Sequence, residues 1–515
     1  MKKTEKFLLG GALLSATSLL IRFVGMTFNV YVTNKIGSAA MGLITLTNSV
    51  YNFAVTFATS GIKLASTRLC AEALGRNSPK ELRSAVKKSI LYAAFFGILA
   101  CVLLFFLAEP ISLYLLDDRR CIKCLKILSP ALPCISIAAA LNGYFTAVSR
   151  VYKNASAVIF EQGVKIFVTV NALTLLLPKG VEYSCIAVIC GSALAEGVSF
   201  FYLFILYLLD LRRHVKKNGA IPKTQTARLF GIALPVAATA YVRSGLLTLE
   251  HMLIPKGLKK YGMSPEVSLA AYGTLQAMAL PIVLFPMAIL SSFTGLIVPE
   301  ISESAAREDH AHIDRLIVRT LRTTLIFASG CAVIIFSFST DLGMVIYNSP
   351  DAAFYIKIFS LLIPVMYFDS AVDCLLQGLG YQVYSMKVNI LDAALSAFLV
   401  WLILPHTGIG GYVFIVFLAE ILNTTLSLLK LFSRKVPKFS IFSSLFMPLL
   451  CALGAVCLVR LSVIFLPFLQ VFSTFAVAFK IILSAIIFVI FLFTTFTVKR
   501  EEVTVLFQRG KKAKA

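Results

Sequence analysis

Charged side chains are scarce in this sequence. They make up 14% of its 515 residues, whereas hydrophobic residues make up 58%. A soluble domain carries roughly 25% charged residues, because its surface must be hydrated. Many apolar runs reach about 20 residues or more, which is long enough to cross a bilayer. The sequence therefore predicts an all-α integral membrane protein. A soluble α-solenoid is the alternative, and the length of the apolar runs disfavours it.

Acidic residues are fewer still. The chain has 25 Asp and Glu against 48 Lys and Arg, so its net charge is +23. In a soluble protein this excess would suggest a nucleic-acid partner. However, the basic loops contain no nucleic-acid-binding motif and lack the interleaved aromatic residues of a single-strand binder. Basic residues also collect in the cytoplasmic loops of membrane proteins. We therefore expect the lipid bilayer as a partner, and no nucleic acid.

Residues and motifs for catalysis or metal binding are rare. There are five histidines, with no H-E-x-x-H, Walker A or nucleophile-elbow motif. Most of the eleven cysteines lie in apolar segments, where cysteine acts as a small hydrophobe. Cys121 and Cys124 form a single C-x-x-C, for which a structural role is favoured over a disulfide or a metal site. We expect no enzyme, metal or cofactor, and transport driven by an ion gradient, the membrane potential or the substrate gradient.

The apolar runs predict about fourteen spanning helices. The first run continues past Arg22 without a cleavage site, so we expect an uncleaved helix rather than a signal peptide. Several runs exceed the bilayer thickness, so tilt is expected. The predicted spans are 7–33, 40–72, 86–108, 126–149, 154–178, 184–210, 228–254, 267–298, 316–339, 354–379, 384–405, 410–432, 440–463 and 471–497.

Basic residues concentrate in alternate loops. The opposite loops carry about a third as many, which predicts a multi-pass protein of the cell membrane with both termini in the cytoplasm. The basic segments are the first six residues, 76–88, 212–228, 307–322, 430–438 and 499–514.

Two polar linkers divide the chain. We expect an N-terminal six-helix lobe over 1–210, a basic cytoplasmic linker over 211–227, and a C-terminal six-helix lobe over 228–432. Two additional helices and a basic cytoplasmic tail occupy 433–515.

The two lobes share landmarks in the same order. Arg22 and Arg243 hold matched positions on the first helix of each lobe, and Leu141–Gly143 corresponds to Leu376–Gly378. Paired helices run in the same direction, so the two six-helix bundles form a parallel repeat about an axis along the membrane normal. Such halves enclose a central cavity and rock to give alternating access.

Several basic residues lie within the predicted spans. A charge in the middle of a spanning helix costs about 2.5–3.5 kcal/mol, so it needs a partner, a wet cavity or a function. Arg offers bidentate donors and Lys a point charge, which suit a phosphate or pyrophosphate. The candidate residues for an anionic headgroup are Arg22, Lys63, Arg68, Lys165 and Arg243. Two alternatives stay open: Lys165 pairs with Glu161 one turn away, which we favour, and Lys63 and Arg68 snorkel to the surface.

Acidic residues and prolines within the predicted spans are further candidates for functional residues. The acids would balance charge or bind a coupling cation; they are Glu161, Glu196, Asp369, Asp373, Asp392 and Glu420. Proline removes a backbone hydrogen bond and can kink a helix. The candidate hinges are Pro235, Pro281, Pro286 and Pro364, with static shaping of a cavity wall as an equal alternative.

Loose motifs occur in a characteristic order along the chain. They are Thr59–Arg68 with Ala71-Glu72, Leu132-Pro133, Asn142–Ala147, Glu161-Gln162, Tyr272-Gly273, Leu296–Ser302 and Leu376–Gly380. With six, six and two helices, the chain resembles the multidrug/oligosaccharidyl-lipid/polysaccharide (MOP) exporter superfamily. Within it, the chain resembles the stage V sporulation protein B group, which is related to the MurJ lipid II flippases.

This resemblance implies a function. An alternating-access transporter would flip an undecaprenyl-pyrophosphate-linked cell-wall or polysaccharide precursor, with sporulation or cortex peptidoglycan synthesis as one context. Cell-wall synthesis enzymes would be candidate partners, and Arg22 matches the basic residue common on the family's first helix. The last two helices would help to form a groove for the lipid tail. The alternatives are a cation-coupled multidrug antiporter of the same superfamily, and a non-transporting membrane scaffold that leaves the deep charges unexplained.

Overall fold

The computed structural model describes residues 3–59, 61–76, 78–213, 225–433, 442–465 and 474–495, and every regular element in them is helical. The first helices are α1 (Lys3–Thr59), α2 (Ile62–Gly75), α3 (Pro79–Pro110), α4 (Cys121–Leu128), α5 (Ala131–Ala147), α6 (Val151–Leu176), α7 (Val181–Arg213), α8 (Gln225–Lys260) and α9 (Pro265–Gly273). They are followed by α10 (Leu280–Leu284), α11 (Met287–Ala306), α12 (His310–Ser337), α13 (Ser339–Tyr347), α14 (Pro350–Ser360), α15 (Ile363–Gly378), α16 (Gln382–Phe432), α17 (Met447–Phe465) and α18 (Thr474–Thr494). Short π or 3₁₀ segments extend some of them: η1 (Ile111–Leu116), η2 (Leu177–Lys179), η3 (Thr274–Ala279) and η4 (Phe442–Phe446).

The helices confirm a polytopic membrane fold. Nine of the described helices are long and apolar enough to cross a membrane, or eleven if two bent helix pairs each form one span. The 51 residues of α16 would extend about 77 Å if straight, more than twice the hydrocarbon thickness of a bilayer. Gly408 (φ 62°) divides α16, and Gly37 (φ 83°) divides α1; only glycine adopts such angles freely. Each of these long helices covers two predicted spans, while the total of fourteen stays a prediction.

One predicted helix is interrupted. The sequence suggests a single span over 40–72, but α1 ends at Thr59 and α2 begins at Ile62. Gly61 lies between them with φ 78°, and a Cβ atom there would stand 2.3 Å from the carbonyl oxygen of Ala233 on α8. The close passage of α8 thus accounts for the break, which the hydropathy pattern does not reveal.

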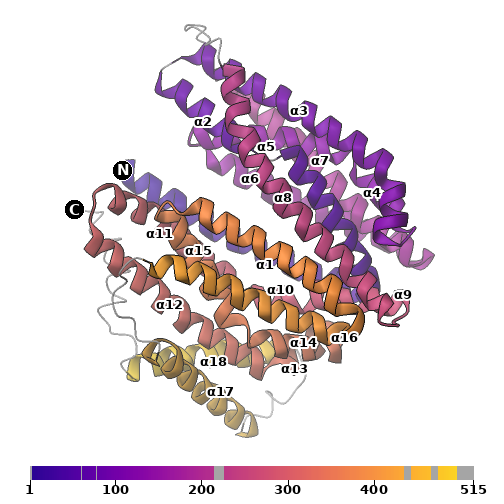
Figure 1. Ribbon diagram of the computed structural model, residues 1–515, viewed down its shortest axis with the longest axis vertical. Coiled ribbons are helices and arrows are strands. Elements are labelled where there is room, and N and C mark those ends of the chain that lie inside the picture. The colour runs from indigo at the N-terminus through magenta and orange to yellow at the C-terminus, as the bar shows by residue number, and fades with distance from the viewer. Residues whose placement is uncertain are drawn as a thin grey trace.

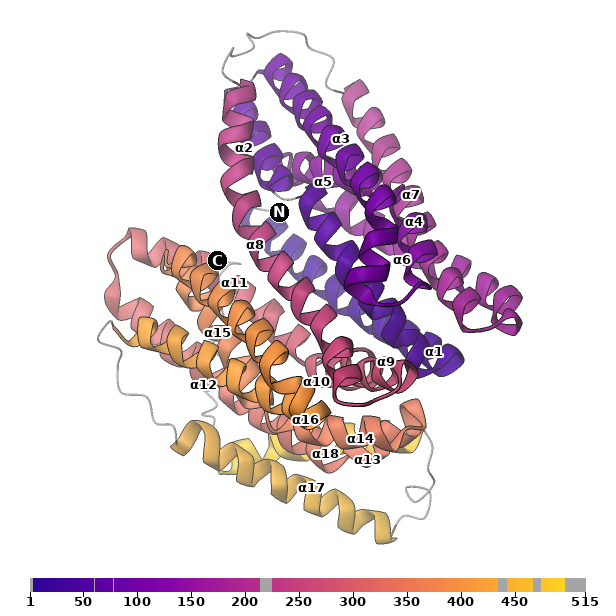
Figure 2. The same ribbon diagram turned by 45° about the vertical axis from the view of Figure 1, so that its right-hand side comes forward.

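The helices form two bundles that meet at one end. We call the side where α7 ends and α8 begins the linker side, and the opposite side the far side. Figures 1 and 2 show the first bundle, with α2 to α7, diverging on the linker side from the second, with α11 to α16. The pair α17 and α18 packs against α12, where Phe488 contacts Gly330. Most of the predicted linker 211–227 lies outside the described residues.

Contacts on the far side join the bundles. A Cβ atom on Gly42 of α1 would stand 2.1 Å from the carbonyl oxygen of Leu269 on α9, so the two backbones touch. Lys259 at the end of α8 forms an ion pair of 2.9 Å with Asp117, which follows η1. The far side is therefore closed by backbone packing and by ion pairing.

Helix α8 belongs to both bundles. Near its start, Gln225 accepts a 2.8 Å hydrogen bond from Ser84 of α3, and Arg228 pairs with Glu72 of α2. Near its end, Gly257 packs closely against Leu404 of α16. A change in the angle between the bundles must therefore be accommodated along α8.

The parallel repeat is visible in the structure. The fourth predicted helix is broken into α4 and α5 with a bend of 41°, and the tenth into α14 and α15 with a bend of 55°. Behind each break the same contact recurs. Thr67 donates to the carbonyl oxygen of Gly143 at 3.2 Å, and Ser302 donates to that of the matched Gly378 at 3.0 Å. The second and fourth helices of each half thus pack in the same way.

The candidate hinge prolines have different surroundings. Pro364 lies at the start of α15, directly after the 55° bend, and Pro286 precedes α11 at the junction with α10. Pro281 follows the π segment η3, whereas Pro235 lies inside the continuous helix α8. Their role in gating stays a prediction.

Candidate substrate-binding site

A polar stripe runs along the second half of α1. Thr45, Asn48, Asn52 and Thr56 follow one another at intervals of three and four residues, so they share one helix face. Polar side chains on a spanning helix are costly unless they face protein or water. Thr45 and Asn48 line one pocket and Thr56 lines another, so the stripe, about 17 Å long, connects the two.

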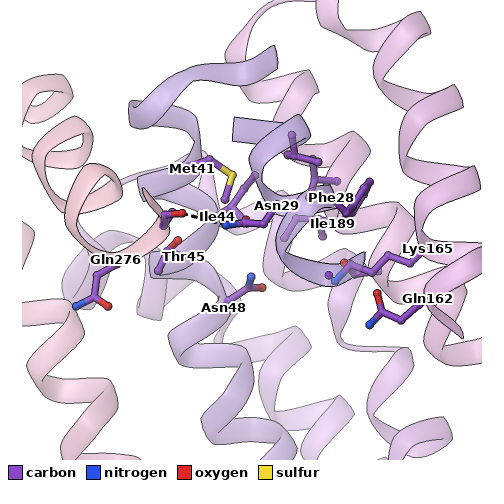
Figure 3. A pocket seen from close by; sticks show the side chains of 15 residues that line it. Phe28, Asn29, Met41, Ile44, Thr45, Asn48, Gln162, Lys165, Ile189 and Gln276 are labelled. Atoms are coloured by element: carbon purple, nitrogen blue, oxygen red, sulfur yellow. Dashed lines mark hydrogen bonds between the residues drawn. The ribbon is translucent and has the colours of Figure 1, made fainter. Parts of the chain in front are cut away.

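The first pocket lies between α1, α6, α7 and η3, with a volume of about 270 Å³. Its polar lining residues are Asn29, Thr45, Asn48, Gln162, Lys165, Ser192 and Gln276. Figure 3 shows Lys165 and Gln162 side by side on the same wall, with Asn48 and Thr45 on another helix. Asn29 donates a hydrogen bond of 2.9 Å to the carbonyl oxygen of Ala277 in η3, so this pocket includes a wall from the second bundle.

Lys165 does not form the ion pair that we expected. Among the described acids none lies within 4.0 Å of its ammonium group, although Glu161 still interacts with it electrostatically. The hydroxyl of Ser199 on α7, close to Glu161, donates to the carbonyl oxygen of Ala157 at 3.5 Å. The i, i+4 spacing allows a pair, but the charged groups of Glu161 and Lys165 do not come within 4.0 Å of each other. The predicted Glu161–Lys165 ion pair is therefore wrong, and Lys165 lines the pocket.

The second pocket lies between α8, α15 and α16, with Thr56 of α1 at its edge and a volume of about 460 Å³. It contains Arg243 and Asp373. The carboxylate of Asp373 accepts hydrogen bonds from Ser385 at 2.7 Å and from Asn389 at 3.2 Å. Arg243 interacts electrostatically with Asp392. This pocket thus holds a cation whose charge is partly balanced by nearby acids.

Four of the predicted acids gather in the second bundle. Asp369 interacts electrostatically with Asp373, Asp392 and Glu420, and its Oδ2 accepts a 3.0 Å hydrogen bond from Asn423. Its other carboxylate oxygen is buried without a hydrogen-bond partner. In the described part of the chain, no group of three or more His, Cys, Asp or Glu has the spacing to hold a metal ion. The cluster adjoins Arg243 through Asp392, with which Arg243 interacts electrostatically.

The remaining acid, Glu196, lies in the first bundle. It accepts a 2.5 Å hydrogen bond from the hydroxyl of Tyr51 on α1. Cys121 and Cys124 are buried free thiols, and Thr47 donates to the Cys121 sulfur at 3.4 Å. The cysteine pair therefore packs the first bundle and lines neither pocket.

The chain is similar in sequence to several known proteins. A family model described as MatE matches residues 14–171. The chain is 24% identical over 428 residues to stage V sporulation protein B of Bacillus subtilis (strain 168), covering 82% of this chain and 83% of that protein. It is 20% identical to sporulation protein YkvU of the same organism, and the match covers 69% of this chain and 78% of that protein.

Two solved structures share the fold. Lipid II flippase MurJ, in an inward closed conformation, superposes with a TM-score of 0.68 at 14% identity and covers 97% of this chain and 99% of that chain. An inward-facing multidrug resistance MATE family transporter of the MOP superfamily gives a TM-score of 0.64 at 11% identity. This match covers 82% of this chain and 99% of that chain. The chain thus shares its fold with a transporter described as a member of the MOP superfamily. It is a multi-pass membrane protein with a transporter fold.

The two structural likenesses differ in extent. The MATE transporter is covered almost completely and yet leaves about a fifth of this chain unmatched, a part similar in size to the segment after residue 432. The flippase structure covers nearly all of the chain. The fold of the described chain, including α17 and α18, is thus that of the flippase structure.

Three predicted basic residues line neither pocket. Arg22 is exposed on α1, one turn before the pocket residue Gly25. Lys63 and Arg68 are exposed on α2, beyond the break at Gly61. The five basic candidates therefore occupy three regions. Among the described residues, Lys165 and Arg243 are the two candidates that line these polar pockets.

Several lining residues were absent from our sequence-based set. They are uncharged, and include Asn29, Asn48, Gln162 and Gln276. The signal that identifies part of this set is the polar spacing of Thr45, Asn48, Asn52 and Thr56 within an apolar span. A search restricted to charged residues misses it, because amides and hydroxyls are tolerated in spans at lower cost than charges.

Proposed function

We propose that this protein is an alternating-access flippase of the MOP superfamily for a lipid-linked precursor that carries a pyrophosphate, such as an undecaprenyl-pyrophosphate glycan. One observation carries the proposal. Lys165 and Arg243 lie in two polar pockets joined by the stripe on α1, and neither forms an ion pair with a described acid. An intramembrane cation without such a partner is expensive unless it serves a function. An anionic headgroup would supply the missing charge, through a bidentate contact from Arg and a point charge from Lys.

The arrangement of the bundles supports alternating access. Backbone packing between Gly42 and Leu269 and the Lys259–Asp117 ion pair join the bundles on the far side. The bundles diverge on the linker side (Figure 2), which we propose is cytoplasmic, with both termini there. A headgroup would enter from the linker side and bind along the polar stripe. Rocking about α8 would then open the far side.

The remaining candidate residues have supporting roles in this proposal. Arg22, Lys63 and Arg68 would attract the headgroup on its way in, since exposed basic residues draw anions without holding them. Asp369, Asp373, Asp392 and Glu420 would balance charge or bind a coupling cation. The broken helices at Pro286 and Pro364, with Pro235 and Pro281, would absorb the bending.

The names of the relatives suggest a biological context. Two Bacillus subtilis relatives are described as sporulation proteins, and the flippase structure is described as one for lipid II. We therefore propose a precursor of peptidoglycan, including that of the spore cortex, with cell-wall synthesis enzymes as partners. These names belong to the relatives and support the proposal only by homology.

A cation-coupled multidrug antiporter is the second candidate. The acid cluster around Asp369 favours it, because a cationic drug needs negative charge in the cavity. The first pocket argues against it, since its only charged lining residue is Lys165. A non-transporting scaffold would leave both pocket cations without a role.

Reconstitution into liposomes tests the proposal. Fluorescent lipid II is placed in the inner and outer leaflets, and its exposure is followed with a membrane-impermeant quencher. We expect protein-dependent flipping that the double variant Lys165→Ala, Arg243→Ala abolishes. Flipping that is unchanged in the double variant would refute the cationic-pocket mechanism. Drug efflux that follows an imposed proton or sodium gradient, without lipid flipping, would establish the antiporter instead.

A further inference from the structure

An apolar cavity adjoins the first pocket on the other side of α1. Its volume is about 400 Å³, and it lies between α1 and α6. Its lining residues are Phe23, Val24, Thr27, Phe28, Tyr31, Ile166 and Val170. Phe28 is the one residue that lines both this cavity and the first pocket. We call this the tail cavity.

The lining follows helical spacing along the two helices. Phe23, Thr27 and Tyr31 are four residues apart on α1, and Ile166 and Val170 are four residues apart on α6. The tail cavity therefore extends about 12 Å along α1. Phe23 is 61% exposed and Tyr31 37% exposed. The cavity is thus a groove that opens to the protein surface, which the bilayer would cover.

The two neighbouring spaces have opposite chemistry. On α6, Gln162 and Lys165 line the polar first pocket, while the next residue, Ile166, lines the tail cavity. On α1, Asn29 lines the first pocket and its neighbour Phe28 separates the two spaces. The polar pocket, with its cation and amides, lies on one side of the Phe28 ring, and the apolar groove lies on the other. Together they match an amphiphile with an anionic head and a hydrocarbon chain.

We infer that the two spaces together bind one polyprenyl phosphate group: Lys165 holds the phosphate, and the tail cavity holds the first isoprene units, so that the chain leaves between α1 and α6. This inference rests on the proposed flippase function and adds the path of the chain. It places the exit of the lipid chain in the first bundle, away from the pair α17 and α18.

The depth of Lys165 in the membrane distinguishes a transported lipid from a resident phospholipid of the surrounding bilayer. Lys165 is the fifteenth residue of the 26-residue helix α6, about 21 Å along a helix of about 39 Å. A resident phospholipid keeps its headgroup at the interface, outside the hydrocarbon core of about 30 Å. A phosphate at Lys165 would lie near the middle of the membrane. Only a lipid in transit has its phosphate at that depth with its chain directed sideways.

Site-specific photocrosslinking tests the inference on the full chain in nanodiscs. The photoreactive residue p-benzoylphenylalanine replaces Ile166 in the tail cavity, or Phe167 as the matched control. Phe167 is the next residue of α6, is 71% exposed and lies outside the cavity. The probes are radiolabelled undecaprenyl phosphate and radiolabelled phosphatidylglycerol. We expect undecaprenyl phosphate to label the Ile166 position about tenfold more than the Phe167 position, and Lys165→Gln to remove that preference. Phosphatidylglycerol should label both positions equally.

Three results would overturn the inference: equal labelling of both positions by undecaprenyl phosphate, a preference that survives Lys165→Gln, or the same preference with phosphatidylglycerol, which would identify a boundary phospholipid. A second measurement uses flipping itself. Val170→Trp fills the tail cavity and should slow flipping of an undecaprenyl-linked precursor about tenfold, whereas Phe167→Trp should change it little. Equal flipping rates for the two variants would contradict the inference.

The two proposals can fail separately. If the wild-type protein flips lipid II but labelling shows no preference for the cavity position, the chain path is wrong and the flippase function stands. If the cavity binds undecaprenyl phosphate but no flipping occurs in liposomes, the site is real and the proposed function is wrong.

Discussion

The hydroxyl of Tyr51 donates a 2.5 Å hydrogen bond to Glu196 across the first bundle. The two residues are 145 positions apart and belong to α1 and α7. This contact gives a buried carboxyl group its one hydrogen-bond partner among the described residues. It also joins the helix that carries the polar stripe to the wall of the first pocket.

Removing the Tyr51 hydroxyl should destabilise the protein. Tyr51→Phe leaves the Glu196 carboxyl buried without that partner, which costs about 1–3 kcal/mol. The measurement is thermal unfolding of the purified protein in detergent. Tyr31→Phe, at a partly exposed ring with no recorded hydrogen bond, is the control and should change the midpoint little. An unchanged midpoint for Tyr51→Phe would show that the carboxyl group finds another partner.

Asp210 should be essential to the linker end of the first bundle. It is 1% exposed, pairs with Arg150 and with Lys153 at 3.2 Å, and accepts a 2.9 Å hydrogen bond from Tyr144. Asp210→Ala leaves two cations without their shared acid, so we expect a loss of about 3–5 kcal/mol in the free energy of unfolding. The control Asp351→Ala removes an exposed acid at a helix N-terminus and should cost below about 1 kcal/mol. Similar losses for both variants would contradict this prediction.

The contact between Gly42 and Leu269 should determine how closely the two bundles pack on the far side. Gly42→Ala introduces a Cβ atom into space that the backbone of α9 occupies, so α1 and α9 must separate. This should lower the free energy of unfolding by about 1–3 kcal/mol. Gly75→Ala is the matched control, because a Cβ there meets no atom within 4 Å. We expect a lower unfolding midpoint and faster cysteine labelling from the far side for Gly42→Ala only. Equal behaviour of the two variants would show that α1 and α9 separate freely.

The pocket cations should matter more for flipping than the exposed ones. Loss of a charge-assisted contact costs about 1.5–3 kcal/mol, so Lys165→Ala and Arg243→Ala should each slow flipping roughly tenfold or more. Arg22→Ala and Lys63→Ala remove exposed cations and should act mainly at low ionic strength, because salt screens their attraction for the headgroup at high ionic strength. The liposome assay for lipid II measures this ranking, with Lys80→Ala on α3 as a surface control. The opposite ranking would move the binding site towards the linker-side surface.

Reporter fusions should establish the orientation in the membrane. The distribution of basic residues predicts both termini in the cytoplasm. Green fluorescent protein fused after Ala515 should therefore fluoresce. Alkaline phosphatase inserted at Gly262, in the far-side turn between α8 and α9, should be active. A dark first fusion together with an inactive second one would reverse the assignment.

The amino-acid sequence by itself determined the membrane fold and its division into repeated halves. Apolar runs of spanning length form helices in lipid whatever their neighbours are, because every backbone group must be satisfied within its own segment. The order of landmarks such as Leu141–Gly143 and Leu376–Gly378 likewise predicted that the fourth and tenth helices correspond, and both are broken in the structure.

The tertiary structure decided which charged residues share a space. The spacing of Glu161 and Lys165 allows a pair, but their charged groups do not come within 4.0 Å of each other, and Lys165 lines the first pocket. Arg22 and Arg243 hold matched sequence positions, yet only Arg243 lines a pocket. The passage of α8 against Gly61 interrupts a helix that hydropathy predicts as continuous. These outcomes depend on side chains and backbones from distant segments, so no local pattern could specify them: a helix fixes the direction in which a side chain leaves it, and the neighbouring helices fix what that side chain meets.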